Sequence, residues 1–190
     1  MIKVPASVLK AAQLFTAASG PMARVSVRGG ESFFDVCATD RFCVFRAFNA
    51  GLSKGGEEMT VDVSDLAKKL RAGDGTVELS DVGGGYVRAD VVDGRRRFMR
   101  LVGEMLKSTD AKFPNARDLV PPDAAPAVGL ALADPKHVLR ACRAAEALKS
   151  AGVEVGFLPR DKGEAPLLFD LAPGKEGLCA LALVAPKVRR

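Results

Sequence analysis

The chain has 190 residues, of which 48% are hydrophobic, and its formal net charge at pH 7 is +5. This length and apolar content can bury a sizeable core, so we expect a globular protein of one large or two small domains. No apolar run reaches the roughly 18 residues of a membrane-spanning helix, and the chain starts with a strand-like segment instead of a secretion signal. We therefore expect a cytoplasmic protein with no membrane contact.

Residues 2–48 have the pattern of a strand, a helix and three further strands. Residues 2–5 are strand-like, and apolar residues recur at helical spacing in residues 6–18, before Gly20-Pro21. The β-rich runs that follow are separated by turn residues, and they predict strands at 24–28, 33–39 and 42–48.

The same order of elements repeats in the next part of the chain. A strand at 59–63 precedes a short helix at 66–71, for which Ser64 or Asp65 can be the N-cap. Glycine-rich turns, including Gly83-Gly84-Gly85, separate three further β-like runs and are typical of hairpins. These runs predict strands at 76–80, 86–92 and 97–102.

A third set of elements follows a proline-rich segment. Residues 121–126 contain three prolines, which stiffen a linker and cannot donate ladder hydrogen bonds. Asp134 followed by Pro135 predicts the N-cap and first position of a helix that extends to about residue 151. Strands are expected before and after this helix, at 128–132, 153–158, 166–171 and 178–185.

Repetition of one strand-helix-strands unit predicts an α+β fold. Two units within residues 1–111 suit one complete domain, residues 112–126 form a linker, and residues 127–190 hold the third unit as a half domain. Such an architecture indicates a function that depends on shape and charge more than on catalysis.

The basic excess is concentrated on the three predicted helices. Residues 6–18, 64–72 and 134–151 contain eight Lys or Arg and three Asp or Glu, so their net charge equals that of the whole chain. On a helical wheel, the basic residues of the third helix fall on one side. The opposite arc holds Val138, Ala141, Cys142, Ala145 and Leu148.

A basic stripe on three exposed helix faces suits a surface that follows a polyanion, because each phosphate contact releases a counterion whatever the base sequence. Lysine and arginine are also ordinary on solvated helix faces, so both interpretations stay open. For a DNA-binding surface the candidate residues are Lys10, Arg24, Lys68, Lys69, Arg71, Lys136, Arg140, Arg143 and Lys149.

Three short segments carry a family resemblance: A-T-D at 38–40, F-P-N-A-R-D-L-V-P at 113–121 and L-V-A-P-K-V-R at 183–189. They resemble the A-T-D-G-H-R-L segment, the F-P-D-Y-R-R-V-L-P linker and the terminal V-V-M-P-M-R-L of the bacterial β sliding clamp, the processivity factor of the replicative DNA polymerase. The order of the units is also similar. The resemblance implies a DNA-clamp fold and duplex DNA as a partner that is bound without sequence preference.

The resemblance further implies a cleft for short peptides of DNA polymerase and other replication proteins. An apolar cleft fits an extended peptide that is anchored by one or two apolar side chains, although ordinary interdomain packing would use the same residue types. Carried over to this sequence, the lining is Thr39, Arg41, Phe42, Val44, Pro114, Leu119, Val184, Pro186 and Val188.

The sequence departs from the family pattern at this cleft and in the number of its units. Arg41-Phe42-Cys43 replaces G-H-R, Asp118 replaces an arginine, and Ala185 replaces a methionine, so the pocket should be altered. The family has six units per chain and this chain has three. A ring of about twelve units would need four chains, or the half domain would complete itself against a partner, so we expect a homo-oligomer. The alternative is a clamp-like adaptor or competitor that binds replication proteins without encircling DNA.

Enzymatic activity is not expected, and we predict no catalytic residue, cofactor or metal. His137 is the only histidine, and no carboxylate pair or nucleophile lies near it in the sequence, so a solvated residue or a phosphate contact is expected. The cysteines form no C-x-x-C pair and should be reduced, mostly buried thiols. They are Cys37, Cys43, Cys142 and Cys179.

Overall fold

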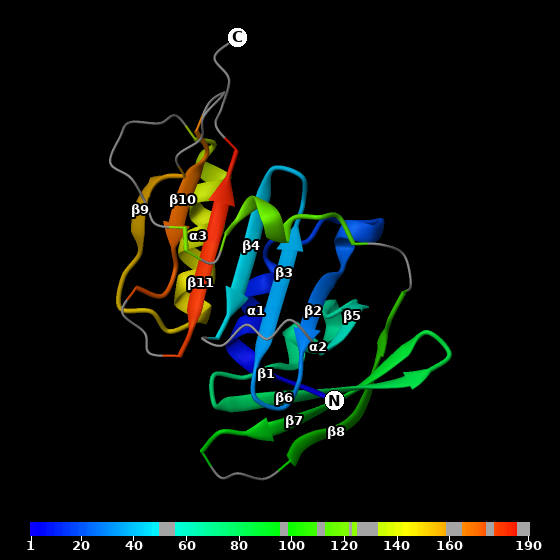
Figure 1. Ribbon diagram of the computed structural model, residues 1–190. Coiled ribbons are helices and arrows are strands. Elements are labelled where there is room, and N and C mark those ends of the chain that lie inside the picture. The colour runs from blue at the N-terminus through cyan, green and yellow to red at the C-terminus, as the bar shows by residue number, and fades with distance from the viewer. Residues whose placement is uncertain are drawn as a thin grey trace.

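The computed structural model describes residues 1–49, 56–95, 99–109, 113–121, 123–124, 133–158, 165–173 and 177–185. Three units follow one another along the chain (Figure 1). The first contains β1 (Ile2–Pro5), α1 (Ala6–Gln13), β2 (Val25–Gly29), β3 (Phe34–Thr39) and β4 (Cys43–Phe48). The second contains β5 (Glu57–Val61), α2 (Ser64–Lys69), β6 (Asp74–Gly83), β7 (Tyr86–Asp93) and β8 (Met99–Lys107). The third contains α3 (Pro135–Ala147), β9 (Glu154–Phe157), β10 (Leu167–Asp170) and β11 (Cys179–Val184).

The first two units exchange their first strands. Strand β1 pairs with β6 of the second unit, with Ile2 opposite Leu79, and β5 pairs with β2 of the first unit, with Val61 opposite Val25. Each of these two units therefore depends on the other to complete its sheet. The pairing of β1, β6, β7 and β8 gives a four-stranded antiparallel sheet.

The third unit extends the sheet of the first. Strand β11 pairs antiparallel with β4, from Cys179 opposite Phe48 to Val184 opposite Cys43. The result is one seven-stranded sheet in the order β5-β2-β3-β4-β11-β10-β9. The division into a complete domain at 1–111 and a half domain at 127–190 stays a prediction.

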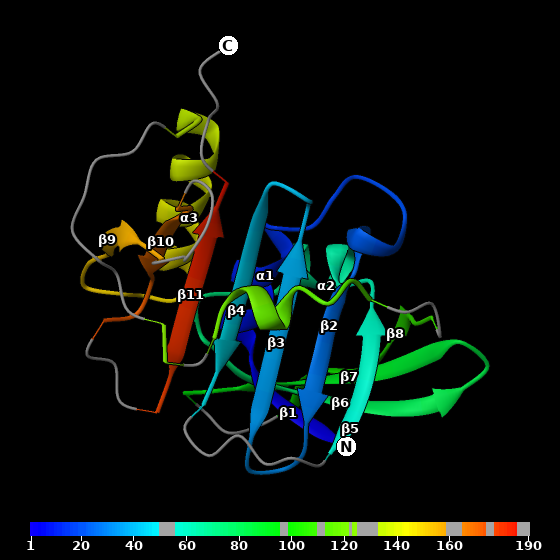
Figure 2. The ribbon, with the colours of Figure 1, turned by 45° about the horizontal axis from the view of Figure 1, so that its top comes forward.

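The helices lie on one face of the seven-stranded sheet, and the segment after β8 crosses the other face (Figures 1 and 2). On the helix side, Phe15 and Phe45 are fully buried and their rings stack with centroids 5.4 Å apart. The buried apolar residues of α1, α3 and both sheets form one continuous core. A smaller apolar cluster lies on the opposite face.

The N-cap predicted from the sequence is correct for α3 but not for α2. As predicted, Asp134 caps α3 by accepting a hydrogen bond from the Lys136 backbone N–H, and Pro135 occupies the first turn. The N-cap prediction for α2 was wrong: the cap residue is Val63, which makes no side-chain capping bond, and the Asp62 carboxylate accepts from the Ser64 N–H instead.

Most expected strands are present with shifted ends. Glycines 83, 84 and 85 all have positive φ angles, of 76°, 63° and 77°, and form the predicted hairpin between β6 and β7. Strand β8 continues to Lys107, well beyond the predicted end at 102, while α1 ends at Gln13 rather than 18. The expected strand at 128–132 lies outside the described residues. No helix in the described part of the chain is both long and apolar enough to span a membrane.

Candidate nucleic-acid interface and peptide surface

A hollow of about 570 Å³ lies where the three helices approach one another. It is lined by residues from α1, the segment after α2, and the C-terminal part of α3. Four of the nine basic residues expected from the sequence line it: Lys10, Arg71, Arg143 and Lys149. We call these four residues the helix-junction cluster. The acidic residues Asp74 and Glu146 line the same hollow, so its wall carries more positive than negative side chains.

Two members of the helix-junction cluster connect the helices by hydrogen bonds. Lys10 Nζ donates to the Leu70 carbonyl at 3.4 Å, and Lys149 Nζ donates to the Ala72 carbonyl at 2.6 Å. Both carbonyls follow the C-terminus of α2, where the helix dipole favours cations. The Arg71 backbone N–H donates to the Asp74 carboxylate at 2.7 Å, but no ion pair of the Arg71 or Arg143 guanidinium group is found among the described residues, so both groups are available to an anion.

The other predicted basic residues are less free to contact an anion. Lys68 pairs with Asp65 at 2.9 Å, and Lys136 lies 3.6 Å from Asp134. Arg24 is partly exposed, follows the short 3-10 helix Pro21–Ala23 and does not line the hollow. Two more residues form close ion pairs: Lys69 with Glu104, and Arg140 with Asp40.

The buried face of α3 differs from the face expected on the helical wheel. Cys142, expected in the core, is exposed, and His137, expected in solvent, is only 7% exposed. The buried arc is thus rotated toward Arg140 by roughly 60°, at 3.6 residues per turn. The reason is tertiary: α3 packs against α1 and reaches the β3–β4 turn, so contacts from two directions decide its buried side.

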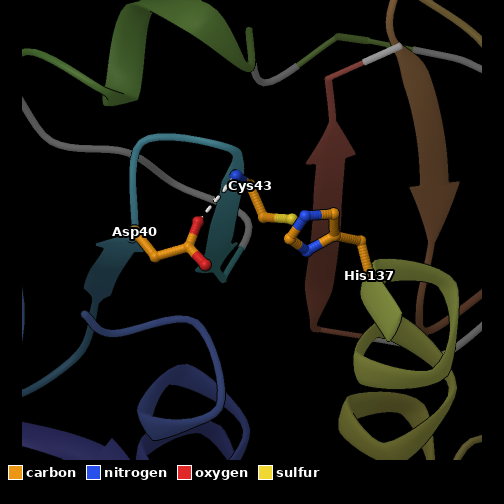
Figure 3. Close-up of side chains that lie close together, drawn as sticks. All are labelled: Asp40, Cys43 and His137. Carbon is orange, nitrogen blue, oxygen red and sulfur yellow. Dashed lines mark hydrogen bonds between the residues drawn. The ribbon is translucent and has the colours of Figure 1, made fainter. Parts of the chain in front are cut away.

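The β3–β4 turn meets α3 at a group of polar side chains. The Asp40 carboxylate accepts hydrogen bonds from the backbone N–H of Phe42 at 3.0 Å and of Cys43 at 2.9 Å, and Arg41 has a positive φ of 82°. The ring of Phe42 stacks on His137 with centroids 6.0 Å apart. Figure 3 shows the His137 imidazole pointing toward Cys43, with Asp40 on the far side of that residue.

Burial and hydrogen bonding set the protonation states of Cys43 and Asp40. Burial raises the pKa of the Cys43 thiol to about 12, so the thiol is protonated at neutral pH. For Asp40, burial acts to raise the pKa, but hydrogen bonds from Arg140, Cys43 and Phe42 outweigh it and hold the pKa below its ordinary value. Asp40 is therefore an anion beside a neutral thiol.

The segment after β8 is fastened to the outer face of the seven-stranded sheet. Its apolar residues Phe113, Ala116 and Val120 cluster with side chains of β3, β4, β10 and β11. Arg46 donates from Nη1 to the carbonyls of Arg117, at 3.2 Å, and Val120, at 2.7 Å. The segment is thus held by both apolar contacts and hydrogen bonds.

The buried carboxylate of Asp35 lies beneath the segment after β8. Asp35 is fully buried, and its carboxylate lies 2.9 Å from Arg46, 3.3 Å from Arg28 and 3.4 Å from Arg117. Arg117 also pairs with Glu58 at 2.8 Å. This network joins β2, β3 and β4 to the segment after β8, and no local sequence pattern indicates it, because its members are spread from residue 28 to residue 117.

The sequence matches no protein-family model and no curated protein. Solved structures are similar over the whole chain. The β subunit of the DNA polymerase of Streptococcus pyogenes matches 100% of this chain with a TM-score of 0.63 and 13% identity. A DNA polymerase sliding clamp from Pseudomonas aeruginosa matches 99% with a TM-score of 0.62 and 11% identity, and one from Bacillus subtilis matches 100% with 0.55 and 14%.

The fold is that of bacterial sliding clamps. This confirms the α+β clamp fold that the three short motifs suggested. The chain spans 66% of the length of the Streptococcus pyogenes and Pseudomonas aeruginosa structures and 64% of the Bacillus subtilis structure.

Within this clamp fold, the residues expected to line a peptide cleft have different surroundings. Phe42 is 61% exposed and Leu119 is 45% exposed, while Pro114 and Arg41 are also exposed. These four of the expected cleft residues are therefore accessible, and the cleft itself stays a prediction.

The remaining expected cleft residues are not accessible or not described. Thr39 is buried and its hydroxyl donates to the Cys43 carbonyl at 2.8 Å, which closes the β3–β4 turn. Val44 is buried in the outer cluster beside the segment after β8. Val184 belongs to the core on the opposite face, because successive residues of a strand point to opposite sides. Pro186 and Val188 lie outside the described residues.

Proposed function

We propose that this chain is a sliding-clamp-like processivity factor for DNA replication, which contacts duplex DNA through its helices and binds short peptides of replication proteins on its outer face. The observation that carries the proposal is the helix-junction cluster, in which three helices bring Lys10, Arg71, Arg143 and Lys149 around one hollow. Lysine and arginine side chains bind phosphate oxygens, so we expect the contact to follow the DNA backbone whatever the sequence.

The placement of the cluster suits a clamp. The helices cover one face of the seven-stranded sheet, and the segment after β8 covers the other, so DNA and peptide contacts would use opposite faces (Figure 2). A clamp can then hold DNA and a polymerase at the same time. Such a processivity factor would act as a homo-oligomer in the cytoplasm.

A DNA-binding measurement tests the proposal. We expect a labelled duplex to bind with an affinity that falls as salt rises, and each phosphate contact contributes about 0.9 to the slope of log affinity against log salt. The double variant Arg143→Gln with Lys149→Gln should therefore lower the slope by about 2 and weaken binding to all sequences equally. Fluorescence anisotropy at several salt concentrations measures both quantities.

The control is a double variant with the same change of charge outside the cluster. Lys3 pairs with Glu78 and Arg88 pairs with Asp90 on the four-stranded sheet, so Lys3→Gln with Arg88→Gln should leave the slope unchanged. Equal losses in the two double variants would mean that only net charge matters. Absence of salt-dependent binding, together with a monomeric mass in sedimentation, would contradict the processivity role.

A clamp-like adaptor that binds replication proteins without encircling DNA is the second candidate. The ion pairs of Lys68, Lys69 and Arg140 favour it, since they reduce the positive charge offered to DNA. In that case a clamp-motif peptide should bind on the face that carries Leu119, and charge reversal of Lys68, Lys69, Arg140 and Arg143 should leave this binding intact. Loss of peptide binding in those variants would count against the adaptor.

A catalytic role is not part of the proposal. Cys43 is 1% exposed and its raised thiol pKa keeps it protonated, so it lacks both access and the thiolate form that a nucleophile requires.

A further inference from the structure

We propose that Asp40, Cys43 and His137 form a binding site for a zinc ion, which fastens α3 of the third unit to the β3–β4 turn of the first. One donor atom from each of the three residues lies within 4.8 Å of the other two. Asp40 and Cys43 come from the β3–β4 turn and the start of β4, whereas His137 comes from α3, more than 90 positions later, and the three meet on the side of the sheet that holds the helices (Figure 3). This site is independent of the proposed contact with DNA.

The donor types suit zinc better than other common cations. A thiolate and an imidazole are soft or intermediate donors, which Ca²⁺ and Mg²⁺ avoid and Zn²⁺ prefers. Zinc lies about 2.0–2.3 Å from such donors in a tetrahedral arrangement, which puts the donors roughly 3.3–3.8 Å from one another. Shifts of about 1 Å in side chains would therefore be enough, and a water molecule would take the fourth position.

A buried histidine nitrogen gives an independent reason to expect a ligand. His137 is only 7% exposed, and its Nδ1 has no hydrogen-bond partner among the described residues. A buried polar atom without a partner is costly, and native proteins satisfy nearly all such atoms. The imidazole lies next to the Cys43 sulfur, so a cation shared by the two side chains would take one of the ring nitrogens as a ligand (Figure 3).

The surrounding groups leave room for coordination. A carboxylate has about four acceptor positions, and Asp40 uses three of them, for the Phe42 and Cys43 N–H groups and for Arg140. One position stays open to the ion. The ion would bind the Cys43 sulfur as a thiolate, and the thiol proton would leave to solvent. The positive charge of Arg140 lowers the affinity but also fixes the carboxylate next to the thiol.

Cobalt binding tests the site directly, because Co²⁺ substitutes for Zn²⁺ and reports its ligands. Protein treated with a chelator and titrated with Co²⁺ should take up one equivalent, with visible bands of tetrahedral cobalt and a thiolate-to-cobalt charge-transfer band. Added Zn²⁺ should remove both signals. Cys43→Ala should abolish the charge-transfer band, and His137→Asn should weaken binding at least about 100-fold, since even outer-shell partners contribute roughly 10- to 100-fold.

Cys37→Ala is the matched control. Cys37 is also fully buried with a thiol pKa of about 12, but it belongs to the cluster on the opposite face of the sheet. We expect Cys37→Ala to retain the charge-transfer band. Cys142→Ser should retain it too, which separates the site from metal held by the exposed Cys142. Circular dichroism of the metal-free variants shows whether each one folds.

Three outcomes would overturn the proposal: no stoichiometric uptake of cobalt or zinc, a charge-transfer band that survives in folded Cys43→Ala, or a band that is lost in Cys142→Ser. If Cys43→Ala fails to fold, folded His137→Asn decides the question alone, because unchanged affinity in that variant would exclude His137 as a ligand.

Discussion

The buried carboxylate of Asp35 makes a strong prediction about stability. Asp35→Asn keeps the shape of the side chain but removes its negative charge, and Arg46, whose side chain is 7% exposed, then stays buried without an anion. Breaking a buried ion pair in this way costs about 3–5 kcal/mol. With a urea dependence of about 1–3 kcal/mol per molar, the midpoint of unfolding should fall by at least about 1 M.

The companion variant Arg46→Met should cost less. Asp35 then keeps Arg28 and Arg117 as partners, and the main loss is the hydrogen bond to the Val120 carbonyl, about 1–3 kcal/mol for a buried acceptor left unpaired. The double variant should be more stable than the sum of the two losses predicts.

Urea unfolding followed by circular dichroism measures these differences. Asp65→Asn, which removes an exposed ion pair with Lys68, is the control and should leave the midpoint unchanged. If Asp35→Asn behaved like this control, or cost less than Arg46→Met, the reasoning about an uncompensated buried cation would be refuted.

Three further predictions concern single positions. Hydrogen bonding from the Lys136 N–H lowers the pKa of Asp134 below its ordinary value of 3.8. The cap therefore stabilises the fold above pH 3.8, and this stabilisation is lost as the pH falls through the lowered pKa. The difference in urea midpoint between wild type and Asp134→Ala should accordingly disappear in acid. Gly29→Ala would put a Cβ 2.4 Å from the Phe33 carbonyl oxygen and should cost about 1–3 kcal/mol, whereas Gly152→Ala meets nothing within 4 Å and should not lower the unfolding midpoint. In the native protein, a thiol reagent followed by mass spectrometry should modify exposed Cys142 rapidly and leave buried Cys37 unmodified until the protein unfolds; equal rates would contradict the burial described.

Local sequence signals were sufficient for much of the fold. Asp134 and Pro135 marked the start of α3, and three consecutive glycines marked the β6–β7 hairpin, because both features depend on the conformational preferences of adjacent residues. The residues of the helix-junction cluster were also named from helix charge, although their convergence on one hollow depends on how the helices pack.

Contacts between residues distant in sequence determine which faces of β4 and α3 are buried, and local sequence patterns do not predict these contacts. Strands β3 and β4 are buried along their whole length, so they lack the alternation that would tell which face Val44 takes. The buried side of α3 follows from its contacts with α1 and the β3–β4 turn, which placed His137 inside and Cys142 outside. No local pattern links His137 to Cys43, since nearly one hundred residues separate them.

The exchange of first strands has a consequence for how the chain is made. Strand β1 is synthesised before its partner β6, so Ile2–Pro5 has no sheet to join until residues 74–83 have been synthesised. Likewise, β4 gains its neighbour β11 only when the last described strand is complete. Contacts this distant in sequence slow folding. Two strand edges near the N-terminus therefore wait unpaired during synthesis, when a chaperone or a neighbouring nascent chain can reach them.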